Sequence, residues 1–187
     1  PPPAFYSGMN MLGTHDTPRI LTMLGARNVP EDRSARASYR MSPQERERGE
    51  RLLRIGAALL YAFPGCPTVY YGDEAGMEGF EDPFNRGTYP WGQEDEGLRK
   101  HFALLGKLRN SRISLQIGDL RWFHAAGPVL AFARTEGEEV TAAILNTGET
   151  LAEVSIPWHG HLAADVFSGQ QFVAVQNRLT VRVPGLE

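Results

Sequence analysis

The chain has 187 residues, which allows one domain or two small ones, and its apolar fraction of 42% excludes a mainly disordered protein. The net charge of −3 provides no basic surface, so we expect no nucleic-acid partner. No apolar run reaches the roughly 18 residues that a membrane span needs, and we expect no membrane partner and a cytoplasmic location.

Residues 1–112 have a pattern of alternating strands and helices. Apolar residues predict a short strand over 4–12 and a second, buried strand over 68–71, which is β-branched and aromatic. Around them we expect a turn of helix over 17–25, a polar segment over 26–41, a long helix over 42–63, a glycine-rich loop over 72–95 and another helix over 96–110. This alternation is typical of a parallel barrel.

The start of the long helix is clearly marked. Ser42 can cap it, Pro43 suits the first helical position, and Glu45 completes a capping box. We expect the charged residues of the opening turns, 45–51, to be a solvated and self-paired end. Further along, apolar residues recur at helical spacing and predict a buried stripe: Leu52, Ile55, Leu59 and Phe63, widened by Leu53 and Leu60.

After Arg112 the pattern changes to short strands of alternating polarity. They are expected over 119–124, 129–134, 140–146, 152–157, 164–167 and 179–183. This pattern predicts an antiparallel β-sandwich, and it places the domain boundary near 112–118, giving domains 1–112 and 113–187. Large aromatic residues of the sandwich are expected in its core: Trp122, Phe132 and Trp158.

Three segments carry the polar residues of a candidate site. They are GTHDTPR at 13–19, PGCPTVYYGDEAGM at 64–77 and DPFNRGTYPW at 82–91. His15 and Asp16 place an imidazole donor beside a carboxylate at the exit of a predicted strand, where a polyol can reach both. The only cysteine, Cys66, lies between glycine and proline at the start of an apolar strand, and we expect it to be a small buried residue.

The three segments, in this order and spacing, resemble the late part of the α-amylase family of glycoside hydrolases. The form of residues 13–19 is most similar to the neopullulanase, cyclomaltodextrinase and maltogenic amylase branch. The resemblance implies an α/β plus all-β fold: the last βα units of a (β/α)8 barrel, then a C-terminal β-sandwich. In this family the nucleophilic Asp and the general-acid Glu lie upstream, so we expect a C-terminal piece that is inactive by itself.

The resemblance also implies roles for individual residues. Asp16 is expected to stabilise the transition state and His15 to donate to sugar hydroxyls. Asp82 and Arg86 are expected to bind a sugar away from the cleaved bond, although a carboxylate and a guanidinium four residues apart can instead bridge one another. Asp73 is expected to belong to the scaffold. We leave Arg19 outside the catalytic set.

Other interpretations of these residues remain open. Metal ligation by His15 and Asp16 lacks further ligands nearby in the sequence, and we expect neither a metal nor a cofactor. The loop aromatics either stack on sugar rings or pack: Phe84, Tyr89 and Trp91. We expect an α-glucan oligosaccharide as substrate of the parent hydrolase and self-association of the incomplete barrel. The alternative is a non-catalytic carbohydrate-binding or assembly module, which an exposed pair of Trp122 and Trp158 would favour.

Overall fold

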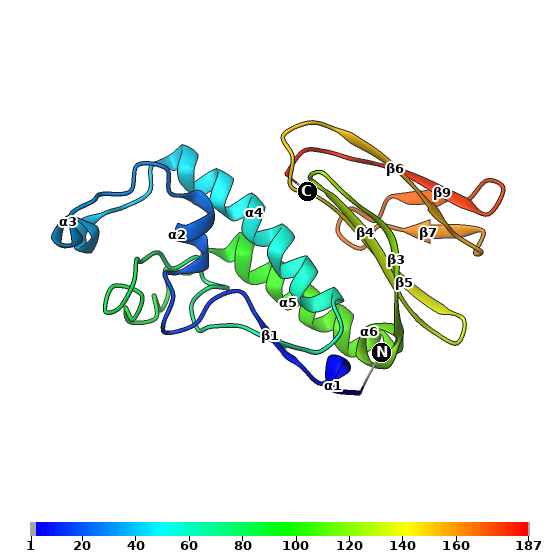
Figure 1. Cartoon of the computed structure of the whole chain (residues 1–187), viewed down its shortest axis with the longest axis horizontal. Coiled ribbons are helices and arrows are strands. Elements are labelled where there is room, and N and C mark those ends of the chain that lie inside the picture. The colour runs from blue at the N-terminus through cyan, green and yellow to red at the C-terminus, as the bar shows by residue number, and fades with distance from the viewer. Residues whose placement is uncertain (1–2, 187) are drawn as a thin grey trace.

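The computed structural model describes residues 3–186, in two parts of different secondary structure (Figure 1). The first part contains α1 (Pro3–Tyr6), β1 (Met9–Met11), α2 (Ile20–Gly25), α3 (Arg33–Ser38), α4 (Pro43–Ala62), β2 (Cys66–Thr68), α5 (Glu96–Ser111) and α6 (Ile113–Ile117). The second contains β3 (Asp119–Ala126), β4 (Val129–Glu136), β5 (Glu139–Asn146), β6 (Ala152–Pro157), β7 (Leu162–Ala164), β8 (Gln171–Val173) and β9 (Arg178–Val183). This succession confirms the predicted fold class, α/β followed by all-β. None of the described helices has the length and apolarity that a membrane crossing needs.

Strands β1 and β2 lie side by side in parallel, with Met9 opposite Cys66 and Met11 opposite Thr68. Helix α4 forms the crossover that two parallel strands require. Both strands are shorter than predicted. The first, expected over 4–12, is limited to Met9–Met11, because Pro3–Tyr6 form helix α1 instead. The second, expected over 68–71, ends at Thr68 because the chain turns beyond it.

The prediction that Cys66 is buried is wrong, because its thiol is exposed. Among the described strands β2 pairs with β1 alone, so its other edge has no neighbour. The apolar residues opposite it on β1 are open to solvent as well, with exposed fractions of 64% for Met9 and 40% for Met11. The parallel pair therefore has an uncovered apolar surface.

The capping box at the start of α4 is confirmed. Ser42 Oγ accepts from Glu45 N at 3.3 Å, and Ser42 N donates to Glu45 Oε2 at 2.8 Å, with Pro43 at the first helical position. The expectation of a solvated end is wrong for Glu45, which is only 7% exposed. Its Oε1 atom also accepts from Arg27 N at 2.7 Å and Asn28 N at 3.2 Å. One carboxylate thus caps the helix and holds the segment that follows α2.

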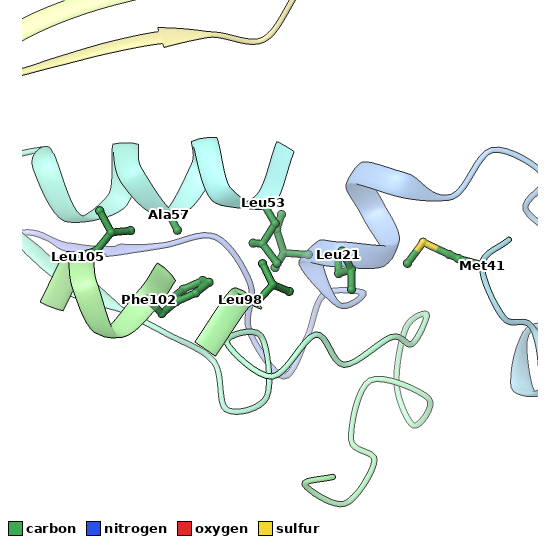
Figure 2. Close-up of a cluster of buried hydrophobic side chains, with 8 residues drawn as sticks. Leu21, Met41, Leu53, Ala57, Leu98, Phe102 and Leu105 are labelled. Carbon is green, nitrogen blue, oxygen red and sulfur yellow. The ribbon is translucent and has the colours of Figure 1, made fainter. Parts of the chain in front are cut away.

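Helix α4 packs against α2 and α5 through a shared apolar core (Figure 2). The core includes Leu21 from α2, Leu53 and Ala57 from α4, and Leu98, Phe102 and Leu105 from α5. Of the predicted stripe Leu53, Ile55 and Leu60 are buried, and Ala57 completes the buried face. Leu52, Leu59 and Phe63 are only partly buried, because periodicity alone does not fix which edge of a wide stripe the neighbouring helices will cover.

The strands of the second part form antiparallel sheets in the order β3-β4-β5, with β6 paired to β9 and β7 to β8. Their core contains Ala131, Val154, Ile156 and Leu179. The strand expected over 164–167 lies at Leu162–Ala164, because Asp165 accepts from Phe167 N at 3.0 Å and Ser168 N at 3.1 Å and so forms a turn. Strand β8 was not predicted.

The aromatic residues of the sandwich have different environments. Phe132 is fully buried, as predicted. Trp122 is 52% exposed, so its predicted place in the core is wrong, although its ring lies 6.1 Å from that of Phe63 at the end of α4. Trp158 is partly buried against the sandwich core. These residues do not form an exposed tryptophan pair.

The carbonyl end of α4 joins the two parts of the chain. Arg109 of α5 donates from Nη1 to Tyr61 O at 2.6 Å and to Phe63 O at 3.2 Å. Arg134 of β4 donates from Nη1 to Ala62 O at 3.2 Å. The last carbonyls of a helix lack intrahelical partners and have the negative end of the helix dipole, so the two cations stabilise this end.

Glu45→Gln tests the cap at the other end of α4. The N–H groups of Ser42 and Arg27 hold the pKa of Glu45 at about 2, below its ordinary value of 4.5. A lowered pKa stabilises the fold above pH 4.5, and this stabilisation is lost as the pH falls toward 2. Glu45→Gln should therefore unfold at lower denaturant concentration than wild type at pH 7, and the difference should shrink below pH 4.5. A difference that stays constant with pH would contradict this role.

Candidate functional site

The predicted pair His15–Asp16 lies on a compact turn that follows β1. Thr14 N donates to Thr17 Oγ1 at 3.0 Å, Thr17 N donates to Thr14 O at 3.3 Å, and Asp16 N donates to Thr14 Oγ1 at 3.1 Å. The two threonines close the turn from within and leave both functional side chains in solvent. The exposed fractions of these side chains are 60% for His15 and 76% for Asp16.

The structure brings the four predicted site residues together. His15 Nε2 lies 3.3 Å from Asp16 Oδ1, and Arg86 Nη2 lies 3.9 Å from the same oxygen. Arg86 Nε also donates to Asp82 Oδ1, so the alternative in which Asp82 and Arg86 bridge one another is observed. An imidazole, two carboxylates and a guanidinium thus line one open surface, with donors and acceptors for the hydroxyl groups of a polyol.

Beneath this surface Arg19, at the end of the turn, is completely buried. Its Nη1 atom donates to Tyr71 O and lies 3.3 Å from Asp73 Oδ1. The guanidinium carbon lies 4.3 Å from the ring centroid of Tyr70 and 4.6 Å from that of Tyr71. Nε and Nη2 have no hydrogen-bond partner among residues 3–186, so the two aromatic faces add to the compensation that Asp73 and Tyr71 O provide for this buried charge.

Asp73 provides the opposite charge at the same place and is 3% exposed. Burial raises the pKa of Asp73 to about 6, and the attraction of Arg19 opposes this rise. A side chain on Gly13 would place its Cβ 3.1 Å from Asp73 Oδ2, so the turn passes directly over this carboxylate. Arg19 and Asp73 therefore support the turn from below, in keeping with the scaffold role expected for Asp73.

Sequence reasoning missed Asn85, which is fully buried between the two exposed residues Asp82 and Arg86. Its Nδ2 atom donates to His15 O and to Thr17 O, both at 2.8 Å. A polar side chain in a loop of polar residues gives no local sign that it will be buried. The one available signal was its place within the 82–86 motif.

The loop aromatics are also placed by the structure. Trp91 is 81% exposed, so it does not pack into the protein, and its ring lies 4.6 Å from that of Tyr89. Phe84 is partly buried. Among the described residues, no group of three or more His, Cys, Asp or Glu side chains has the arrangement of a metal site.

No family model matches the chain. It is 35% identical over 203 residues to an amylopullulanase of Thermoanaerobacter thermohydrosulfuricus, covering 100% of this chain and 13% of that protein. It is 30% identical over 184 residues to a cyclomaltodextrinase of Geobacillus thermopakistaniensis, covering 95% of this chain and 28% of that protein. The chain thus spans less than a third of either relative.

Among solved structures, an Anoxybacillus α-amylase matches with a TM-score of 0.79 and 22% identity, over 97% of this chain and 37% of its own. The architecture is therefore that found in part of the α-amylases, a β/α segment followed by antiparallel sheets. Further relatives are named neopullulanase and maltogenic α-amylase, as the form of residues 13–19 predicted. The chain belongs to the α-amylase family of glycoside hydrolases.

Proposed function

We propose that this chain is the C-terminal part of a retaining α-glucan hydrolase, with Asp16 as its transition-state stabiliser. The substrates would be maltooligosaccharides, cyclodextrins or pullulan, cleaved at α-1,4 glucosidic bonds, with α-1,6 bonds as a second candidate. The names of the relatives, amylopullulanase and cyclomaltodextrinase, support this substrate class. The single observation that carries the proposal is the open Asp16 carboxylate, with His15 and Arg86 directed at the same oxygen.

The chemistry of glycoside hydrolysis explains why such a carboxylate is useful. The reaction passes through an oxocarbenium-like state and, with retention, uses two carboxyl groups roughly 5–5.5 Å apart. We assign these two groups to parts of the enzyme outside residues 1–187. A third carboxylate of the protein, placed beside the sugar ring, then contributes without transferring a proton. It binds the sugar hydroxyls more strongly as the ring flattens in the transition state.

His15 and Arg86 would have different tasks in this site. The neutral imidazole of His15 offers one donor and one acceptor to the same sugar as Asp16. Arg86 is bridged to Asp82, and the two side chains remain 45% and 59% exposed. We propose that this pair binds a neighbouring sugar and opens its mutual contact when hydroxyl groups replace it.

The alternative of a non-catalytic module based on the sandwich has less support. It called for an exposed tryptophan pair on one sheet face. Trp122 instead lies against Phe63 of the helical part, and Trp158 packs on the sandwich core. We also propose the domain boundaries 1–112 and 113–187. Helix α6, at Ile113–Ile117, then follows the barrel part directly and precedes the sheets.

We also propose that the isolated chain self-associates through its uncovered barrel surface. Besides Met9 and Met11, Tyr71 is 42% exposed, beside an open hollow of about 530 Å³ that includes Tyr61 and Phe102. Light scattering across a concentration series should show an average mass that rises with concentration, because apolar surface is removed from water. A monomer at every concentration that binds no hydrophobic dye would contradict this proposal.

The isolated chain should not hydrolyse maltotriose. It has the proposed stabiliser, but the nucleophile and the acid/base are assigned to other parts of the enzyme, and their loss removes most of the catalysis. The measurement is product release by the purified chain, with the full-length enzyme as the positive control. Turnover that survives further purification and disappears in Asp16→Asn would overturn the division of roles.

In the full-length enzyme, Asp16→Asn and Arg86→Ala should have different kinetic effects. Asp16→Asn keeps the size of the side chain but removes its charge, so kcat should fall by a factor that corresponds to about 3 kcal/mol or more. Arg86→Ala removes ground-state binding of a neighbouring sugar and should act chiefly by raising KM. Steady-state kinetics on maltotriose measures both effects.

Glu138→Gln is the matched control, since it removes an exposed carboxylate charge from a turn of the sandwich. Its kinetics should equal those of wild type. Circular dichroism should confirm that all variants are folded. If Asp16→Asn kept kcat within a few-fold of wild type, Asp16 would not be the stabiliser.

A further inference from the structure

The side chain of Asn85 contacts the backbone on both sides of Asp16. Its Nδ2 atom donates to His15 O and to Thr17 O at 2.8 Å each, across 70 and 68 positions of sequence. The two acceptors are carbonyl oxygens, which cannot donate, so the amide nitrogen must face them. One buried amide therefore holds the main-chain carbonyls of the two residues that flank Asp16, the residue with the proposed catalytic role.

The environment of Asn85 shows which atoms of its side-chain amide form hydrogen bonds. The residue is 0% exposed, and no described residue bonds to its Oδ1 atom. A buried acceptor without a partner costs free energy, so this amide is not an optimal choice for stability alone. Both N–H donors are used, and both are directed at the turn that presents His15 and Asp16.

The next residue in the chain faces the other way. Asn85 is directed inward to the backbone around Asp16, whereas Arg86 lies at the surface with Nη2 3.9 Å from Asp16 Oδ1. Two consecutive residues of one loop thus contact the same turn: Asn85 bonds to the carbonyls of His15 and Thr17, and Arg86 lies close to the Asp16 carboxylate. Thr14 Oγ1 holds Asp16 N at 3.1 Å and completes this support.

We infer that Asn85 is a positioning residue, which sets the direction of the Asp16 carboxylate toward the sugar by holding the carbonyls of His15 and Thr17, the residues on both sides of it. The inference rests on the proposed function of Asp16. Misplacement of a catalytic group by about 1 Å can cost on the order of 100-fold in rate. Loss of the Asn85 amide should therefore lower kcat through Asp16, with little effect on sugar binding elsewhere.

A double-mutant cycle in the full-length enzyme tests this inference. Asn85→Ala should lower kcat on maltotriose by on the order of 100-fold and change KM by no more than a few-fold. In the Asp16→Asn background the same substitution should lower kcat by less than about 3-fold, because a carboxylate that is absent cannot be misplaced. Asn110→Ala, on the exposed last turn of α5, is the matched control and should leave kcat unchanged in both backgrounds.

The outcomes separate the inference from the proposed function. If Asp16→Asn alone leaves kcat unchanged, the proposed function fails, and the inference fails with it. If Asp16→Asn lowers kcat but Asn85→Ala causes the same loss in both backgrounds, the positioning role is overturned while the proposed function stands. A merely structural residue would give this second, additive result.

A second variant covers the case in which Asn85→Ala does not fold. Asn85→Ser keeps one hydroxyl donor in a smaller side chain, and it should show the same dependence on Asp16 with a smaller loss of kcat. Circular dichroism and thermal unfolding identify which variants are folded. If neither variant folds, Asn85 is required for the fold itself, and its assignment as a positioning residue is overturned.

Discussion

Helix α4 is bonded at both ends by residues that are distant in sequence, and the arrangement of the other elements depends on this. At its start the Glu45 carboxylate caps the helix and also accepts N–H groups of the segment after α2. At its end Arg109 and Arg134 donate to the last carbonyls. Unpaired N–H and C=O groups at helix ends are costly when buried. These contacts therefore pair the end groups of α4, and they also hold the segment after α2, helix α5 and strand β4 against it.

The candidate site follows from this arrangement. Because the end of α4 is held, β2 begins in a fixed register beside β1, and the turn after β1 lies next to the loop after β2. Gly79 O accepts from Arg19 N at 2.9 Å, and Asn85 reaches the carbonyls around Asp16. Residues from two separate loops thus form one surface, with its charged groups exposed and its support buried.

Sequence reasoning succeeded where the signal was local. The capping box at Ser42 and Glu45 depends on residues three apart, and it is confirmed. The four proposed site residues lie within two short motifs and are close together in the structure, and their roles stay proposals. It failed where burial is decided by distant elements. Cys66 has the neighbours of a buried strand residue, but no described strand covers it, and the sequence around Trp122 does not show that its ring lies against Phe63.

Asn85 is the most instructive of these failures. Its neighbours Asp82 and Arg86 were identified through the family resemblance of the motif that contains them. The amide between them was overlooked because its partners are backbone atoms some 70 residues away. A contact with a main-chain carbonyl cannot be read from the identity of the acceptor residue, since every residue has that group.

This same property affects how the protein can diverge. Asn85 and Arg134 hold their partners by main-chain oxygens, so substitutions at His15, Thr17 or Ala62 leave the acceptors in place. The side chains at the surface of the proposed site can then change in evolution while the main-chain contacts beneath them are kept. Specificity can therefore diverge while the architecture is retained, because specificity depends on the side-chain atoms of these residues and the architecture on their main-chain oxygens.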